Sequence, residues 1–274
     1  MTGQQRIIIF SDLDGTLLDH GDYSWQAALP ALKELKEQDI PLVLASSKTA
    51  AEMAPIRAAL GFDHCEAIVE NGAGVLPPQV SQPTAQRSHD GLLAVLAAMP
   101  AALRSGFSGF SDWSVEEVSR RTGLDLAASE RAKMRDFSEP GLWSGSDAQL
   151  QEFLQALEAK SLFAQQGGRF LTLSFGASKA DRLREIVSLY ENRWDGPVES
   201  FALGDAANDV AMLEAASRGA IIPNPAHGGI GPMQGENDGR IIRATMAGPA
   251  GWNESVLSFL ANRVMTKTEV KKET

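Results

Sequence analysis

The stretch IIIFSDLDGT (residues 7–16) joins an apolar run to two carboxylates. The run Ile7–Phe10 predicts a short strand that is buried on both faces, as in a parallel sheet. Asp12 and Asp14 follow the end of this strand, where removing a charge from water is costly. Groups that compensate the charge of these carboxylates must therefore come from elsewhere.

The composition is that of an ordinary globular protein with a substantial core. The chain has 274 residues, of which 43% are hydrophobic and 22% charged, and its formal net charge is −10. This charge argues against a nucleic-acid partner, because a phosphate backbone requires clustered Lys and Arg. The sequence shows neither a membrane-spanning run nor a signal peptide, and its single cysteine, Cys65, fits a reducing compartment. We therefore expect a cytoplasmic protein that binds neither nucleic acid nor a membrane.

Alternating strand and helix signals at the two ends of the chain predict an α/β fold with a doubly wound parallel sheet, Rossmann-like in its winding. In the first part, the expected elements are strands at 7–10, at 40–47 and in 66–76, the last with a turn at Asn71-Gly72, a helix at 25–36, and a helix opened by the capping box of Thr49 and Glu52. In the last part, they are a helix from 179 to about 190, a strand that ends in the acidic residues of 204–209, a short strand at 219–225, and a closing helix in 248–264.

The middle of the chain has a different pattern. A stretch rich in Pro, Ser and Gln at 77–88 predicts a linker. The signals beyond it suit an inserted α+β domain, which we place at 80–177, leaving 1–79 and 178–274 as the core. Its expected elements are a helix at 91–104, helices opened by capping boxes at Ser114 and Ser146, and two strands in 162–175 joined through Gly167-Gly168.

Polar side chains follow the ends of the predicted core strands, where an open α/β sheet binds its ligands. Two carboxylates there could share Mg²⁺, which prefers oxygen ligands, while hydroxyl, lysine and backbone amide groups could hold a phosphate. One aspartate could attack phosphorus, and an acid two residues on could protonate the leaving alkoxide. The candidate residues are Asp12, Asp14, Ser46, Ser47, Lys179, Asp205, Asn208 and Asp209.

Several motifs point to a known superfamily. DLDGT (12–16), Ser46, Lys179 and GDAAND (204–209) resemble, in order and spacing, the four motifs of the haloacid dehalogenase (HAD) phosphatases. The insertion at 80–177 resembles the α/β cap of the Cof-type branch, and VENGAGV (69–75) is typical of that branch. A narrower resemblance, to the mannosyl-3-phosphoglycerate phosphatase family, rests on SSKTAAEM (46–53), RDFSEP (135–140), GGRFLTL (167–173) and AGPAGW (247–252).

The resemblance implies Mg²⁺ as cofactor, a small phosphorylated glycoside as partner, and a role for each matching position. Ala206 stands where the superfamily often has a serine, which removes at most one supporting hydrogen bond. The implied roles are Asp12 as nucleophile and metal ligand, Asp14 as general acid/base with its carbonyl on the metal, Asp205 as further metal ligand, Asn208 and Asp209 as groups that orient Lys179 and the metal's surroundings, and Ser46, the backbone of Ser47 and Lys179 as phosphoryl ligands.

Four cap residues are candidates for substrate recognition. A planar guanidinium suits a carboxylate, so Arg135 and Arg169 are the expected ligands of the glycerate group. Ser138 and Glu139 could bond sugar hydroxyls. A solvated arginine is the alternative for both arginines, and Lys48 could be a surface residue or a charge in the pocket.

The sequence therefore predicts a phosphatase that converts mannosyl-3-phosphoglycerate to mannosylglycerate, a compatible solute, and phosphate through an aspartyl-phosphate. Glucosyl-3-phosphoglycerate or another sugar phosphate, as in sucrose-phosphate phosphatases, is the alternative substrate. A phosphomutase or a non-catalytic sugar-phosphate sensor are further alternatives, and the intact Asp12 and Asp14 argue against the sensor.

Overall fold

The computed structural model describes residues 6–82, 88–167, 169–226 and 228–270, with side chains up to Arg263. The chain divides into two compact units, one made of Met1–Ala45 and Leu183–Thr274 and the other of Ser46–Arg182. The insertion predicted at 80–177 falls within the second unit, and its boundaries stay a prediction.

The main sheet is mixed and mostly parallel, which confirms the predicted fold class. Its strand order over the described residues is β11-β10-β9-β1-β2-β3-β4. The pairs β1–β2, β1–β9, β9–β10 and β10–β11 are parallel, and β3–β4 is antiparallel. The strands are β1 (Arg6–Ser11), β2 (Leu42–Ala45), β3 (Ala67–Val69), β4 (Gly74–Leu76), β9 (Val198–Gly204), β10 (Arg218–Ile221) and β11 (Ile241–Arg243).

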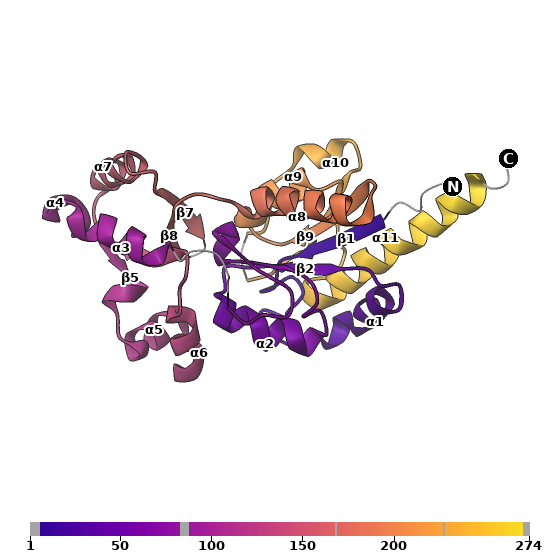
Figure 1. Ribbon diagram of the computed structural model, residues 1–274, viewed down its shortest axis with the longest axis horizontal. Coiled ribbons are helices and arrows are strands. Elements are labelled where there is room, and N and C mark those ends of the chain that lie inside the picture. Colours follow the sequence, from indigo (N-terminus) through magenta and orange to yellow (C-terminus); the bar gives the residue numbers. More distant parts are fainter. Residues whose placement is uncertain (1–5, 83–87, 168, 227, 271–274) are drawn as a thin grey trace. The chain divides into compact units, whose positions relative to one another are not determined.

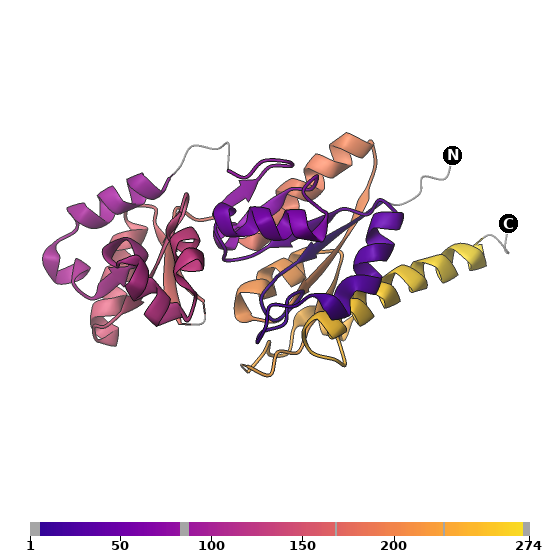
Figure 2. The ribbon, with the colours of Figure 1, turned by 90° about the horizontal axis from the view of Figure 1, so that it is seen from below.

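Helices cover both faces of the strands in the first unit. In Figure 1, α8, α9 and α10 lie on one side of β1 and β9, and α1 and α11 lie on the other. The helices α1 and α11 run next to each other in both ribbon views (Figure 1, Figure 2). Ile8, Ile9 and Phe10 of β1 are consequently fully buried, as the apolar run predicts. The helical elements are η1 (Gln26–Ala28), α1 (Leu29–Glu37), α8 (Lys179–Trp194, shared between the units), η4 (Ala207–Asp209), α9 (Val210–Ala215), α10 (Gln234–Asn237) and α11 (Gly248–Val270).

The direction of winding reverses at β1. Strand β2 follows β1 in the chain and lies on one side of it, whereas β9 lies on the other side and comes much later. Ligands of open α/β sheets bind beyond the carboxyl ends of the strands at such a switch point. Asp12 follows β1 and Asp205 follows β9, so both residues stand at this point.

The second unit contains the β3–β4 hairpin and a separate antiparallel sheet of order β5-β6-β8-β7. The predicted turn at Asn71-Gly72 is confirmed, and it splits the expected third strand into β3 and β4. The other elements are α2 (Ala50–Leu60), η2 (Glu70–Gly72), α3 (His89–Ala98), α4 (Ala101–Arg104), β5 (Phe107–Gly109), η3 (Phe110–Asp112), α5 (Val115–Thr122), α6 (Leu126–Lys133), β6 (Ser138–Trp143), α7 (Asp147–Glu158), β7 (Phe163–Gly167) and β8 (Phe170–Ser174).

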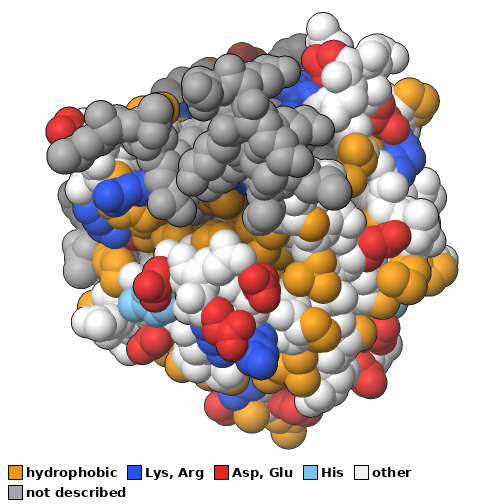
Figure 3. Space-filling model, turned by 90° about the vertical axis from the view of Figure 1, so that its right-hand side faces the viewer, with side chains coloured by type: hydrophobic (Ala, Val, Ile, Leu, Met, Phe, Trp, Pro, Cys, Tyr) orange, Lys and Arg blue, Asp and Glu red, His pale blue; other side chains and the backbone are white. Residues whose placement is uncertain are grey.

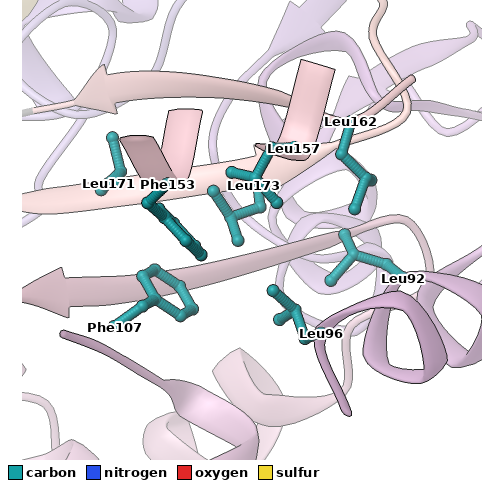
Figure 4. Close-up of a cluster of buried hydrophobic side chains, with 8 residues drawn as sticks. All are labelled: Leu92, Leu96, Phe107, Phe153, Leu157, Leu162, Leu171 and Leu173. Atoms are coloured by element: carbon teal, nitrogen blue, oxygen red, sulfur yellow. The ribbon is translucent and has the colours of Figure 1, made fainter. Parts of the chain in front are cut away.

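Alternating side chains of the smaller sheet pack into two apolar cores. On β8, Leu171 and Leu173 point into a cluster with side chains of α3 and α7, whereas Phe170 packs against a second cluster under α5 and α6. Figure 4 shows Phe153 and Leu157 of the first cluster meeting the strand residues from their helix. Both faces of this sheet are therefore covered, which gives the second unit a core of its own.

Local signals set several helix starts. The capping boxes at Thr49–Glu52 and Ser146–Gln149 are confirmed, whereas the box predicted at Ser114 is only half formed: the Glu117 amide donates to the Ser114 hydroxyl without the return bond. The prediction of one helix over 91–104 was wrong. Pro100 lacks an N–H and forces Met99 into an extended conformation, so α3 ends at Ala98 and the short α4 begins at Ala101. The predicted joint Gly167-Gly168 includes Gly168, which lies outside the described residues.

Candidate active site

Two predicted site residues stand at the ends of neighbouring parallel strands. Ser11 of β1 is in register with Leu203 of β9, and the Asp12 amide donates to the Leu203 carbonyl at 2.9 Å. The next residues along the two strands bring Asp12 and Asp205 to the same edge of the sheet. Both are buried, with 7% and 2% of their surface exposed.

The Asp205 carboxylate is oriented by two uncharged donors. The Thr16 hydroxyl donates to Oδ1 at 3.0 Å, and the Asn224 side-chain amide donates to Oδ2 at 2.7 Å. Gly15, with φ of +83°, passes so close that a Cβ there would lie 2.1 Å from the Asn224 Nδ2. A glycine is required at this position, because any side chain would push Asn224 off Asp205.

Asp209 is fully buried one turn further on, in η4. Its Oδ2 accepts the backbone amides of Asp205 and Ala206, each at 3.2 Å. These bonds close the turn that follows β9, and Asp209 directly precedes α9. Asn208 precedes it and is half-buried.

Asp12, Asp205 and Asp209 each offer one carboxylate oxygen to a common point, and these oxygens all lie within 4.8 Å of one another. Three buried carboxylates at this spacing repel strongly unless a cation or protons neutralise them. An all-oxygen donor set of this kind suits a hard divalent cation such as Mg²⁺. Asp14 is half-buried in the turn that leads away from β1, where it bridges to Leu18.

The last helix anchors the backbone next to Asp12. The indole Nε1 of Trp252, a fully buried residue of α11, donates to the Ser11 hydroxyl at 2.9 Å. That hydroxyl donates in turn to the Asp12 carbonyl at 2.7 Å. The chain of bonds fixes the turn that presents the Asp12 carboxylate.

In the second unit, Ser46 and Lys179 are both buried, with 1% and 2% of their surface exposed. Ser46 directly follows β2, and Lys179 is the first residue of α8. Gly72, with φ of +99°, packs against the start of α8 so tightly that a Cβ would lie 2.5 Å from the backbone nitrogen of Lys179. Ser47 is exposed, and its carbonyl accepts from Arg135.

The four predicted cap ligands all have partners within the protein. The Arg135 guanidinium pairs with Glu70, with Nε 3.3 Å from Oε2, and the Ser138 hydroxyl donates to the same carboxylate at 2.6 Å. Glu139 is buried and accepts from the Ser111 amide at 2.7 Å.

The Arg169 guanidinium donates to two carbonyls at the end of α5, that of Arg121 at 2.8 Å and that of Thr122 at 3.1 Å. The sugar- and carboxylate-binding roles of the cap residues therefore stay predictions, and the structure adds a structural role for each side chain.

Three site residues were missed by the sequence analysis. Thr16 lies within DLDGT, and Asn224 follows β10, so the strand-end argument that found Asp205 also applies to Asn224. Glu70 follows β3 within VENGAGV and binds a segment 66 to 68 positions later, a contact that the motif itself does not reveal.

The surface charge and the helix composition relate to the prediction that the protein binds neither nucleic acid nor a membrane. On the described part of the face in Figure 3, acidic and basic side chains lie scattered among apolar and polar ones. Within the described ranges, no helix combines the length and the apolarity needed to cross a membrane. The absence of nucleic-acid and membrane partners and the cytoplasmic location stay predictions.

Residues 9–90 match the family of haloacid dehalogenase-like hydrolases. A phosphatase of the haloalkanoate (HAD) enzyme superfamily from Bacteroides thetaiotaomicron has a similar structure, with a TM-score of 0.66 and 20% identity over 93% of this chain and 95% of that one. The sucrose-phosphatase of Synechocystis sp., solved with sucrose and phosphate, has a TM-score of 0.59 and 15% identity over 93% and 98%. A haloacid dehalogenase-like hydrolase from B. subtilis has a TM-score of 0.58 and 19% identity over 91% and 96%. The chain therefore has the haloacid dehalogenase-like fold, and the match over 9–90 supports that superfamily of hydrolases.

Proposed function

We propose that the protein is a Mg²⁺-dependent phosphatase that cleaves mannosyl-3-phosphoglycerate into mannosylglycerate and phosphate. The observation that carries the proposal is the buried cluster of Asp12, Asp205 and Asp209 at the switch point of the sheet. The match of residues 9–90 to haloacid dehalogenase-like hydrolases supports the reaction class.

The donor set fits the proposed cation. Asp12 and Asp205 would hold it through carboxylate oxygens and Asp14 through its backbone carbonyl, while Thr16 and Asn224 keep the Asp205 carboxylate in orientation. When bound, the cation would offset the charge of the carboxylates and of the phosphoryl oxygens.

The chemistry falls on the two acids of DLDGT. A carboxylate oxygen of Asp12 attacks phosphorus, and the bond from phosphorus to the ester oxygen breaks. Protonated Asp14 gives its proton to the leaving alkoxide. Asp14 then takes a proton from water as that water attacks the same phosphorus, which breaks the bond to Asp12 and releases phosphate.

The remaining core residues bind the phosphoryl group in this proposal. The Ser46 hydroxyl, the Ser47 amide and the Lys179 ammonium donate to its oxygens. Lys179 and Ser46 are buried, so their positions are set by the fold rather than by the substrate.

A phosphorylated sugar without a glycerate carboxylate is the second candidate substrate. The observation that favours it is the pairing of Arg135 with Glu70, which occupies one of the two guanidinium groups expected to bind that carboxylate. The likeness in fold to sucrose-phosphatase points the same way. A phosphomutase would share the aspartyl-phosphate but return the phosphoryl group to a sugar.

A substrate panel tests the proposal. Mannosyl-3-phosphoglycerate, glucosyl-3-phosphoglycerate and sucrose 6-phosphate are incubated with the protein in Mg²⁺ or in EDTA, in water enriched in ¹⁸O. We expect Mg²⁺-dependent release of labelled phosphate, fastest from the mannosyl compound. Faster release from sucrose 6-phosphate would show that a sugar phosphate without glycerate is the preferred substrate. Unlabelled phosphorylated products would indicate a mutase. No turnover of any ester would refute a phosphatase.

A further inference from the structure

Glu70 has a completely buried carboxylate, and the hydrogen-bond partners that it has among the described residues are donors. Its Oε1 accepts the Asp136 amide at 2.9 Å. Its Oε2 accepts the Phe137 amide at 3.2 Å, the Ser138 amide at 2.8 Å and the Ser138 hydroxyl at 2.6 Å. The Arg135 guanidinium adds a compensating charge, with its Nε 3.3 Å from Oε2. The side chain thus binds the backbone of 135–138, which leads into β6.

The backbone around Glu70 binds a different segment, the loop after β2. The Glu70 amide donates to the Lys48 carbonyl and the Asn71 amide to the Ser46 carbonyl, both at 2.9 Å. Arg135 donates to the Ser47 carbonyl from both terminal nitrogens, at 3.2 and 3.3 Å. Three consecutive carbonyls of 46–48 are therefore held by one turn and one side chain.

The same turn also contacts the start of α8. Glu70, Asn71 and Gly72 have φ of 51°, 58° and 99°, a run of left-handed residues that costs free energy and persists only when surrounding bonds impose it. Gly72 lies against the backbone of Ser178 and Lys179, and its carbonyl accepts from the Arg182 Nε at 3.0 Å. The turn therefore touches both segments that carry the predicted phosphoryl ligands of this unit.

We infer that Glu70 is a positioning residue, which fixes the loop 46–48 and the start of α8 against the segment 135–138 and thereby sets the affinity for a phosphoryl group. The inference rests on the proposed function for its effect on affinity. Its structural part, the coupling of the three segments, can be measured without turnover.

The test is Glu70→Gln in the full chain. The amide keeps one acceptor oxygen but replaces the other with an NH₂ group, which cannot accept a backbone N–H. We expect hydrogen exchange of the amides at 70, 71, 136 and 138 to become at least about tenfold faster. We also expect KM for p-nitrophenyl phosphate with Mg²⁺, and the inhibition constant of inorganic phosphate, to rise about tenfold with kcat changed less than about twofold, because binding common to substrate and transition state is lost.

Asp112→Asn is the matched control. Asp112 lies in the same unit and also accepts a backbone amide, from Gly109, and an arginine, Arg104, but it is remote in the chain from the turn. We expect this variant to lose stability while KM and the exchange at 70 and 71 stay as in the wild type. A general loss of folded protein would lower the apparent kcat and leave KM unchanged.

Unchanged exchange at 70 and 71 in Glu70→Gln would overturn the inference, and so would unchanged KM in an active enzyme. If the wild type releases no phosphate from any ester, the proposed function fails. The exchange pattern alone then decides the coupling, with faster exchange at 70 and 71 supporting it and unaltered exchange refuting it.

Discussion

Two buried carboxylate sites in the two units are built in opposite ways. At Asp205, an uncharged hydroxyl and an uncharged amide donate to the carboxylate, and oxygens of two further acids lie within 4.8 Å of one of its oxygens. At Glu70, three backbone amides and a hydroxyl surround one carboxylate, and Arg135 balances its charge.

The cluster at Asp205 could hold a cation, whereas the bonds of Glu70 hold backbone segments together. The three acids of the Asp205 site repel one another, and a cation between them would relieve that repulsion. The Glu70 site is complete as it stands, so its carboxylate holds backbone in place and has no need of a ligand.

Asp12→Asn should give the largest effect, and it tests whether the acidic site carries the proposed reaction. The amide is close in shape to the carboxylate but a poor nucleophile, so turnover of p-nitrophenyl phosphate should fall at least about 1000-fold. Thermal unfolding in EDTA serves as the control, and Tm should stay level or rise because one of three like charges is gone. Substantial residual activity in a preparation free of wild-type enzyme would contradict the covalent route.

Glu70→Gln and Asp205→Asn, compared without metal, test the two charge balances directly. Glu70→Gln should lower the free energy of unfolding by about 3 kcal/mol, since it disrupts a buried, fully bonded carboxylate. Asp205→Asn should change it by less than about 1 kcal/mol, because lost bonds are offset by reduced repulsion. Both are measured by urea unfolding in EDTA, and equal losses would show that the two sites do not differ as described.

Adding Mg²⁺ should stabilise the wild-type protein through the acidic site and not through the Glu70 site. At a hundredfold excess over Kd, a cation that binds only the folded protein stabilises it by about 2.7 kcal/mol, which raises Tm by roughly 5–10 °C for a chain of this size. Asp205→Asn should remove most of that shift, and Glu70→Gln should keep it. A similar Mg²⁺-dependent rise in Tm for wild type and Asp205→Asn would place the cation elsewhere.

Glu236→Gln should give the smallest effect and provides a partly exposed reference for the two buried sites. A hydrogen bond from Arg243, together with the Met233 amide, lowers the pKa of Glu236. A lowered folded-state pKa contributes stability above the unfolded value, and this is lost as the pH falls through the folded value. The variant should lose less than about 1 kcal/mol at pH 7, and the difference should shrink as the pH falls below about 4. A difference that grows in acid would contradict this assignment.

Features that repeat along a strand or sit at a helix start could be predicted from the sequence. The buried β1, the acids after β1 and β9 and the Thr49 capping box follow from local pattern and from parallel strands sharing an edge. The break at Pro100 was equally local and was missed only because the apolar periodicity runs on across it.

Features made by bonds between distant segments could not be predicted. Glu70 and Arg135 lie in VENGAGV and RDFSEP, but neither motif shows that the two residues pair, because the pairing depends on how the β3–β4 turn meets the segment before β6. The substrate-binding role given to Arg135 rested on its residue type, which fits a carboxylate of the protein as well as one of a ligand.

The bond from Trp252 to Ser11 spans 241 positions of the chain. During synthesis the first strand leaves the ribosome long before the helix that steadies it. The proposed nucleophile therefore gains this support only once synthesis has passed Trp252, and a chain that stops before that residue carries DLDGT without it.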